Sequence, residues 1–95
     1  MVDIVSIPTV YGLGSAYPNP FNPTTSIELA MPQDGFVAIK VYNLKGQVVA
    51  TLHEGMLTAN RYSFTWDAMN MASGMYFIKA ETAENVDVQK IMLMK

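Results

Sequence analysis

The 95-residue chain has a formal net charge of −2 and is 51% hydrophobic and 15% charged, which excludes a disordered tail and allows one modest core. Its six Lys and Arg are spread along the chain and form no basic stripe, which argues against a nucleic-acid-binding surface. The absence of cysteine excludes disulfides and thiolate metal sites, and no apolar run approaches the roughly 20 residues of a membrane-spanning helix.

Residues 1–16 contain small residues and turn formers, among them Pro8, Gly12 and Gly14. This composition is typical of a linker, so we expect the folded domain to occupy residues 17–95. The apolar residues between positions 2 and 10 are also compatible with an additional edge strand, which is the alternative interpretation of this segment.

Residues 17–23 hold three prolines at close spacing. Each proline fixes its own φ at about −65° and favours an extended residue before it, so this segment is neither a helix nor a central strand. We expect an ordered loop that leads into the first strand, with the rings of Tyr17 and Phe21 as apolar anchors against a core. We call it the proline loop; it consists of Tyr17, Pro18, Asn19, Pro20, Phe21, Asn22 and Pro23.

From Ser26 onward, apolar and polar residues alternate with a period of two, which indicates half-buried β-strands. Turns rich in Pro, Asn and Gly at 32–35 and 43–46 separate them, and we expect the third strand to end near Glu54 and Gly55. Six or seven short strands at this spacing predict an all-β fold, an Ig-like or fibronectin III-like antiparallel β-sandwich. The predicted strands lie within residues 26–31, 37–42, 47–52, 62–66, 74–80 and 86–94.

Aromatic residues alternate along the fourth of these strands, a pattern more typical of a core than of a ligand platform. Tyr76 follows a glycine-containing turn and fits a tyrosine corner, in which the hydroxyl donates a hydrogen bond to upstream backbone. The core that we predict consists of Ile39, Val41, Tyr62, Phe64, Trp66 and Tyr76.

The titratable residues form no pattern typical of a catalytic site. The single histidine, His53, is predicted to lie on the surface near a turn. Asp67 and Asn70 offer too few oxygen atoms for Ca²⁺, which takes six to eight ligands. Lys40 and Lys79 fall on the polar positions of their strands, so neither is expected to be a buried, activated amine. The sequence therefore predicts a module with no enzymatic activity, metal or cofactor.

Motifs along the chain resemble one known family. Residues 17–27 read Y-P-N-P-F-N-P-T-T-S-I, residues 66–67 read W-D, residues 73–77 read S-G-M-Y-F, and residues 90–95 read K-I-M-L-M-K. In this order they resemble the C-terminal sorting domain, type A, of the type IX (Por) secretion system, which is similar to the Ig-like domain of flagellar hook-capping proteins. The resemblance spans about residues 8–95. Asn60 and Ala68 depart from it, since glycine is usual at both positions.

The resemblance implies a signal that directs an upstream passenger protein across the outer membrane of Bacteroidota-like bacteria for attachment to the cell surface. The partners that it implies are the type IX outer-membrane translocon, the shuttle and sortase proteins, and the covalently attached passenger. The implied route runs through the periplasm to the outer-membrane surface or the medium. A structural or adhesive Ig-like module, hook-cap-like or carbohydrate-binding, remains the alternative.

A folded domain serves as an address by presenting a surface, and the last strand is our candidate for it. We expect residues 86–95 to form an unpaired edge that can add to a partner's sheet, with Lys90 and Lys95 as flanking polar residues. The candidate residues for recognition by the translocon are Lys90, Ile91, Met92, Leu93, Met94 and Lys95.

Overall fold

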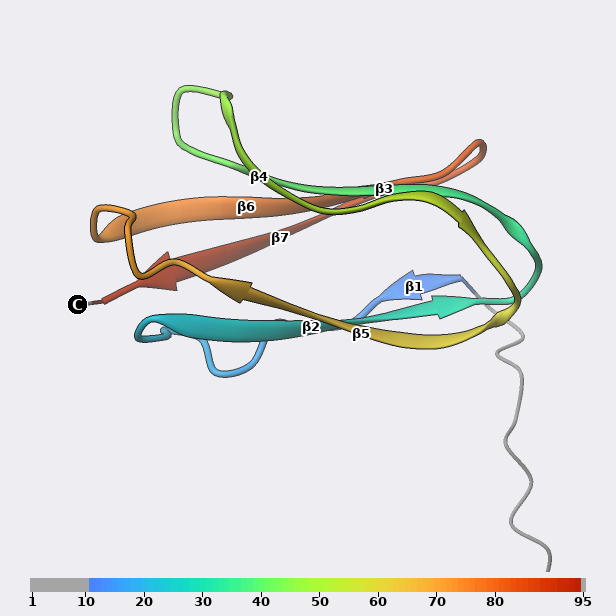
Figure 1. The fold of residues 1–95 in the computed structure, drawn as a ribbon, viewed down its shortest axis with the longest axis horizontal. Coiled ribbons are helices and arrows are strands. Elements are labelled where there is room, and N and C mark those ends of the chain that lie inside the picture. The colour runs from blue at the N-terminus through green and yellow to red at the C-terminus, as the bar shows by residue number, and fades with distance from the viewer. Residues whose placement is uncertain (1–10, 95) are drawn as a thin grey trace, which may run out of the picture.

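A computed structural model describes residues 11–94 of the chain and shows two antiparallel β-sheets packed face to face (Figure 1). No helix is present in this described part. The first sheet has the strand order β1-β2-β5, and the second has the order β4-β3-β6-β7. The predicted all-β antiparallel sandwich is confirmed. Its strands are β1 (Gly12–Leu13), β2 (Thr24–Met31), β3 (Gly35–Tyr42), β4 (Val48–Leu57), β5 (Asn60–Asp67), β6 (Gly74–Glu81) and β7 (Val86–Leu93).

The chain crosses between the two sheets twice at the same end of the sandwich, which we call the crossover end. The turn at 32–34 leads from β2 to β3, and residues 58–59 lead from β4 to β5. The Asp34 carboxylate accepts a hydrogen bond from the Ala59 N–H at 2.8 Å and thereby ties the two crossings together. The proline loop, the β3–β4 turn and the end of β7 lie at the opposite end.

The β3–β4 turn has the predicted hairpin chemistry. The Asn43 side-chain oxygen accepts hydrogen bonds from the N–H groups of Lys45 at 2.9 Å and Gln47 at 3.0 Å, and Gly46 has a φ of 81°. β4, however, does not end near Glu54 and Gly55 as the sequence suggests. Gly55 pairs with Val37 in the ladder, so the strand continues to Leu57.

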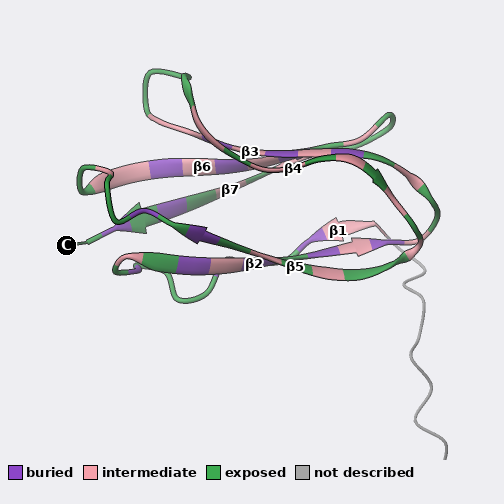
Figure 2. Cartoon of the chain, viewed as in Figure 1, coloured by how far each residue is buried: buried purple, intermediate pink, exposed green. Residues whose placement is uncertain are grey.

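The core lies between the sheets, and its largest rings cluster at the proline-loop end. Trp66 is 5% exposed, and its ring centroid lies 5.7 Å from that of Phe21 and 5.2 Å from that of Tyr76. Along β2, β3 and β6, buried residues alternate with more exposed ones, as Figure 2 shows. Both sheets contribute buried apolar side chains, among them Leu13, Ile27, Leu29, Met31, Val37, Ile39, Val41, Ile78, Ala80, Ile91 and Leu93.

Two of the rings that we expected in the core are only half-buried. Tyr62 and Phe64 pack against the core from β5, with 6.4 Å between their centroids. β5 and β4 are edge strands of their respective sheets, so the side of the sandwich between them is open to water. Of the three β5 rings predicted for the core, Trp66 is buried in it, whereas Tyr62 and Phe64 are partly buried and pack against it.

Residues 11–16, which the sequence assigns to the linker, pack on the sandwich. Leu13 pairs with Leu29 of β2, and the Gly14 N–H donates to the Glu28 carbonyl at 2.8 Å. Leu13 and Ala16 are buried. The possible edge strand among residues 2–10 and the candidate residue Lys95 lie outside the described residues.

Candidate functional site

The last strand occupies an edge of the second sheet, as expected, but much of this edge is not free. β7 pairs with β6 along its full length. On its other side, the proline loop runs beside its C-terminal half. The Phe21 N–H donates to the Met92 carbonyl and the Met94 N–H donates to the Phe21 carbonyl, both at 2.9 Å. Phe21 thus forms a parallel bridge with Leu93, like one residue of an additional strand.

The side chain of Asn19 continues this contact along β7. Its Nδ2 donates to the Lys90 carbonyl and its Oδ1 accepts from the Met92 N–H, both at 3.0 Å. A side-chain amide has the same donor and acceptor groups as a peptide unit, so Asn19 replaces the main chain of a neighbouring strand. The expectation of an unpaired edge is therefore wrong for residues 90–94, because a loop about 70 residues away in sequence pairs with it.

The predicted recognition residues divide into two groups. Ile91 and Leu93 are each 1% exposed and belong to the core. Lys90, Met92 and Met94 point outward, with Met92 38% and Met94 54% exposed. A partner that contacts the folded domain can therefore touch Lys90, Met92 and Met94 but cannot touch the two buried side chains.

The proline loop is held on the sandwich by few but well-buried contacts. Phe21 is 2% exposed, and the buried Thr25 hydroxyl donates to the Pro18 carbonyl at 2.8 Å. The Ala68 N–H donates to the Pro23 carbonyl at 2.9 Å. Tyr17, expected as a second anchor, is instead 80% exposed, because its main chain pairs with Ser26 while its ring projects into solvent.

The Tyr76 hydroxyl makes the hydrogen bond that a tyrosine corner predicts. It donates to the Ala72 carbonyl at 2.6 Å, across the loop that joins β5 to β6. Within the same loop, the Asp67 carboxylate accepts from the Met69 N–H at 3.0 Å. Ala68, which departs from the family pattern, is fully buried beside Pro23. The loop between β5 and β6 therefore contacts the proline loop at Pro23.

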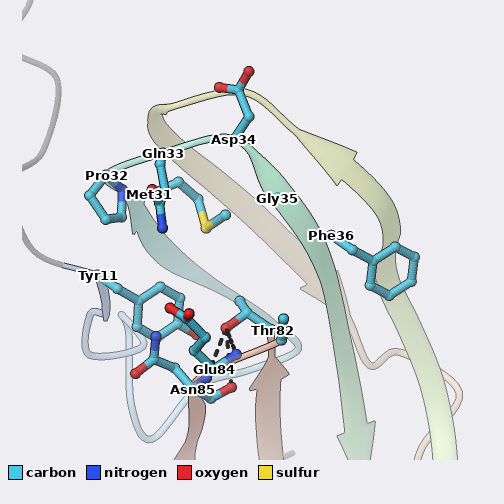
Figure 3. A pocket seen from close by; sticks show the side chains of 11 residues that line it. Tyr11, Met31, Pro32, Gln33, Asp34, Gly35, Phe36, Thr82, Glu84 and Asn85 are labelled. Atoms are coloured by element: carbon cyan, nitrogen blue, oxygen red, sulfur yellow. Dashed lines mark hydrogen bonds between the residues drawn. The ribbon is translucent and has the colours of Figure 1, made fainter.

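A pocket of about 180 Å³ lies at the crossover end, far from the proline loop (Figure 3). It is lined by Tyr11, the turn at 32–35 and the turn at 82–85. The Tyr11 hydroxyl is buried and has no hydrogen-bond partner among the described residues; burial and the nearby Asp87 carboxylate raise its pKa. Figure 3 shows Asp34 pointing away from Tyr11, so this carboxylate does not pair with the Tyr11 hydroxyl.

The remaining candidate groups also lie apart from one another. The prediction of a surface histidine is wrong: His53 faces inward opposite Ile39, its Nε2 is buried, and its ring centroid lies 5.6 Å from that of Phe64. The Lys40 Nζ lies 3.6 Å from a Glu54 oxygen, and the Lys79 Nζ lies 5.8 Å from the Tyr42 ring centroid. Across residues 11–94, no three His, Asp or Glu side chains gather as a metal site.

The described residues include no helix that is long and apolar enough to cross a bilayer. No curated protein matches the chain. A family model described as the secretion system C-terminal sorting domain matches residues 15–94, which include both the proline loop and β7. Because this match covers most of the sequence, the chain belongs to the C-terminal sorting domains of the type IX (Por) secretion system.

Proposed function

We propose that this domain is a type A sorting signal, which directs an upstream passenger through the type IX translocon for attachment to the cell surface. The chain upstream of Tyr11 connects the passenger to the domain, because residues 11–16 pack on the sandwich. The observation that carries the proposal is the hydrogen-bonded contact of the proline loop with β7, because it builds two of the family's characteristic segments into one surface.

The element that the translocon reads is a surface at the proline-loop end, which we call the recognition surface. It consists of the exposed side chains of Tyr17, Asn19, Lys90, Met92 and Met94. Methionine is flexible and polarisable and adapts to a partner, while Tyr17 adds a large amphipathic ring. Recognition uses these side chains rather than strand addition along residues 90–94, since that part of the edge is already hydrogen-bonded.

The position of Tyr11 supports this assignment. Tyr11 lies at the crossover end, beside the turns at 32–35 and 82–85. The recognition surface lies at the opposite end of the strands, where Phe21 meets Leu93. The chain therefore enters the described domain away from the surface that the translocon has to reach.

A fusion experiment tests the sorting function. A reporter passenger carrying residues 1–95 at its C-terminus is expressed in a type IX-competent host, and surface and periplasmic fractions are compared with those of the passenger alone. We expect surface delivery only with the domain attached. Equal delivery of the passenger alone would contradict the sorting function and favour the adhesive or structural alternative.

A further inference from the structure

The two outer faces of the sandwich have different chemistry. The outward residues of β2 and β5 in the first sheet are nearly all polar or charged, as expected for a solvated face. In register pairs, they are Thr24 with Asp67, Ser26 with Thr65, Glu28 with Ser63, and Ala30 with Arg61.

The outer face of the second sheet, which we call the mixed face, exposes many large apolar side chains instead. Val37, Ile39 and Val41 of β3 are fully buried, so the alternating residues 36, 38, 40 and 42 face outward. The contacts of Lys79 with Tyr42 and of Lys40 with Glu54 place β6 and β4 residues on the same face. Its exposed apolar residues are Phe36, Val48, Met56, Val86, Val88 and Met92. The outward residues of β2 and β5 include no large exposed apolar side chain, so the exposed apolar residues of the two sheets are concentrated on the mixed face.

The pairing register arranges the mixed face in rows that run across the strands. At the centre, a row containing Lys79 lies next to a row containing Glu81. A row with Tyr42 and Phe77 flanks these two charged rows on one side, and a row with Phe36 and Met56 flanks them on the other. From one side to the other, the rows are Val48–Tyr42–Phe77–Lys90, Thr51–Lys40–Lys79–Val88, Glu54–Ala38–Glu81–Val86 and Met56–Phe36.

When a second copy of the face is turned so that its rows run in the opposite order, each row meets a row of complementary charge or polarity. Consider a twofold axis that lies between two stacked mixed faces and runs across the strands, midway between the Lys79 and Glu81 rows. Each copy's Lys79 then lies opposite Glu81 of the second copy, and Tyr42 lies opposite Phe36. On the other strands, Val48 lies opposite Met56 and Val88 opposite Val86. An axis along the strands instead places the lysine rows against each other, which is repulsive.

We propose that the mixed face binds a second copy of this chain in an isologous, face-to-face dimer about that axis. A twofold contact requires one self-complementary patch, and the sequence of rows supplies it. Two sheets that pack face to face keep their strands within about 30° of each other, which preserves the pairing of rows. Met92 and Met94 lie beyond the outermost row with an opposite partner, whereas Lys90 lies at the end of that row, so Lys90 is the one residue that the dimer face shares with the proposed recognition surface.

The size of the mixed face sets the expected strength of the dimer. Four strands about 4.8 Å apart and seven residues of about 3.3 Å each give a face of roughly 400 Å² in projection. This is smaller than the roughly 800 Å² per partner of standard interfaces. We therefore expect a weak dimer, with a dissociation constant of about 10⁻⁵ to 10⁻⁴ M.

Sedimentation equilibrium of the full chain between about 10 μM and 1 mM tests the proposal. Lys79→Glu places two carboxylates opposite each other twice per dimer and should raise the dissociation constant at least about tenfold. Lys79→Glu combined with Glu81→Lys exchanges the charges, restores opposite signs and should return it to within about threefold. Arg61→Glu changes the net charge as much as Lys79→Glu does, but on the outer face of the first sheet, and should leave it unchanged.

A chain that stays monomeric up to about 1 mM would overturn the proposal. So would an equal effect of Arg61→Glu and Lys79→Glu, which would indicate general charge repulsion. Failure of the exchanged pair to restore association would rule out this axis. These measurements require no secretion host, so their outcome is independent of the sorting function.

Discussion

The Asn19 side chain hydrogen-bonds to the main chain on either side of Ile91, donating to the Lys90 carbonyl and accepting from the Met92 N–H, both at 3.0 Å. One amide thereby closes an edge that would otherwise be available for strand pairing. The same contact fixes the proline loop against the last strand. The stability of the domain and the shape of its recognition surface therefore depend on a shared pair of hydrogen bonds.

Asn19→Ala should lower the free energy of unfolding by about 1–2 kcal/mol, since it removes two hydrogen bonds and leaves their main-chain partners to water. Asn22→Ala is the matched control, because Asn22 lies exposed in the same loop, and it should change stability by less than about 0.5 kcal/mol. Urea denaturation measures both. Equal effects of the two substitutions would mean that the Asn19 contact does not stabilise the domain.

Trp66→Ala should cost about 3–5 kcal/mol, since Trp66 is 5% exposed and contacts the rings of Phe21 and Tyr76. Phe64→Ala removes a half-buried ring of the same strand and should cost less, about 1–3 kcal/mol. Thermal unfolding of the two variants checks the order. A Phe64→Ala protein that is less stable than Trp66→Ala would show that the core is centred elsewhere.

Tyr76→Phe should cost about 1 kcal/mol, because it removes only the hydroxyl that donates to the Ala72 carbonyl at 2.6 Å. Tyr42→Phe is the control, since the Tyr42 ring lies on the outer face beneath the Lys79 ammonium. We expect Tyr42→Phe to leave the urea midpoint unchanged. A Tyr76→Phe midpoint equal to that of the parent would show that the tyrosine corner adds no stability.

Tyr11→Phe should leave stability at pH 7 unchanged or raise it by up to about 1 kcal/mol, because it removes a buried hydroxyl without a partner among the described residues. The pKa of Tyr11 is raised above its ordinary value of 10.0, since burial and Asp87 disfavour the phenolate in the folded state. The stability gained from keeping this phenol neutral is present below about pH 10 and is lost as the pH rises through the raised pKa. Urea midpoints at pH 8 and pH 11 should therefore differ less for Tyr11→Phe than for the parent, and an equal difference would contradict the assignment.

Local patterns predicted much of the fold. The period-two alternation located six of the strands, and the residues from Asn43 to Gly46 predicted the hairpin turn between β3 and β4. The glycine-containing turn before Tyr76 correctly predicted a hydrogen bond to upstream backbone. Each of these features depends on residues that are close together in the sequence.

Long-range relationships could not be predicted in the same way. Nothing in the sequence of the proline loop indicates that Asn19 binds Met92, because a side-chain amide can hydrogen-bond to any exposed N–H and carbonyl groups of the main chain. His53 faces inward because the pairing of β3 with β4 shifts between Ile39 and Lys40, which changes the alternation along β4. The partial burial of Phe64 follows from the edge position of β5, which only the order of the strands reveals.

Surface delivery of a passenger fused to recognition-surface variants tests the central claim most directly. Lys90→Glu combined with Met94→Glu changes two exposed side chains, and Arg61→Glu combined with Thr65→Glu makes the same change in net charge on the opposite sheet. With both proteins folded, as checked by thermal unfolding, the first pair should reduce the surface fraction at least about tenfold, whereas the second pair should leave it unchanged. Normal surface delivery by the Lys90→Glu, Met94→Glu variant would show that the translocon reads a different part of the domain.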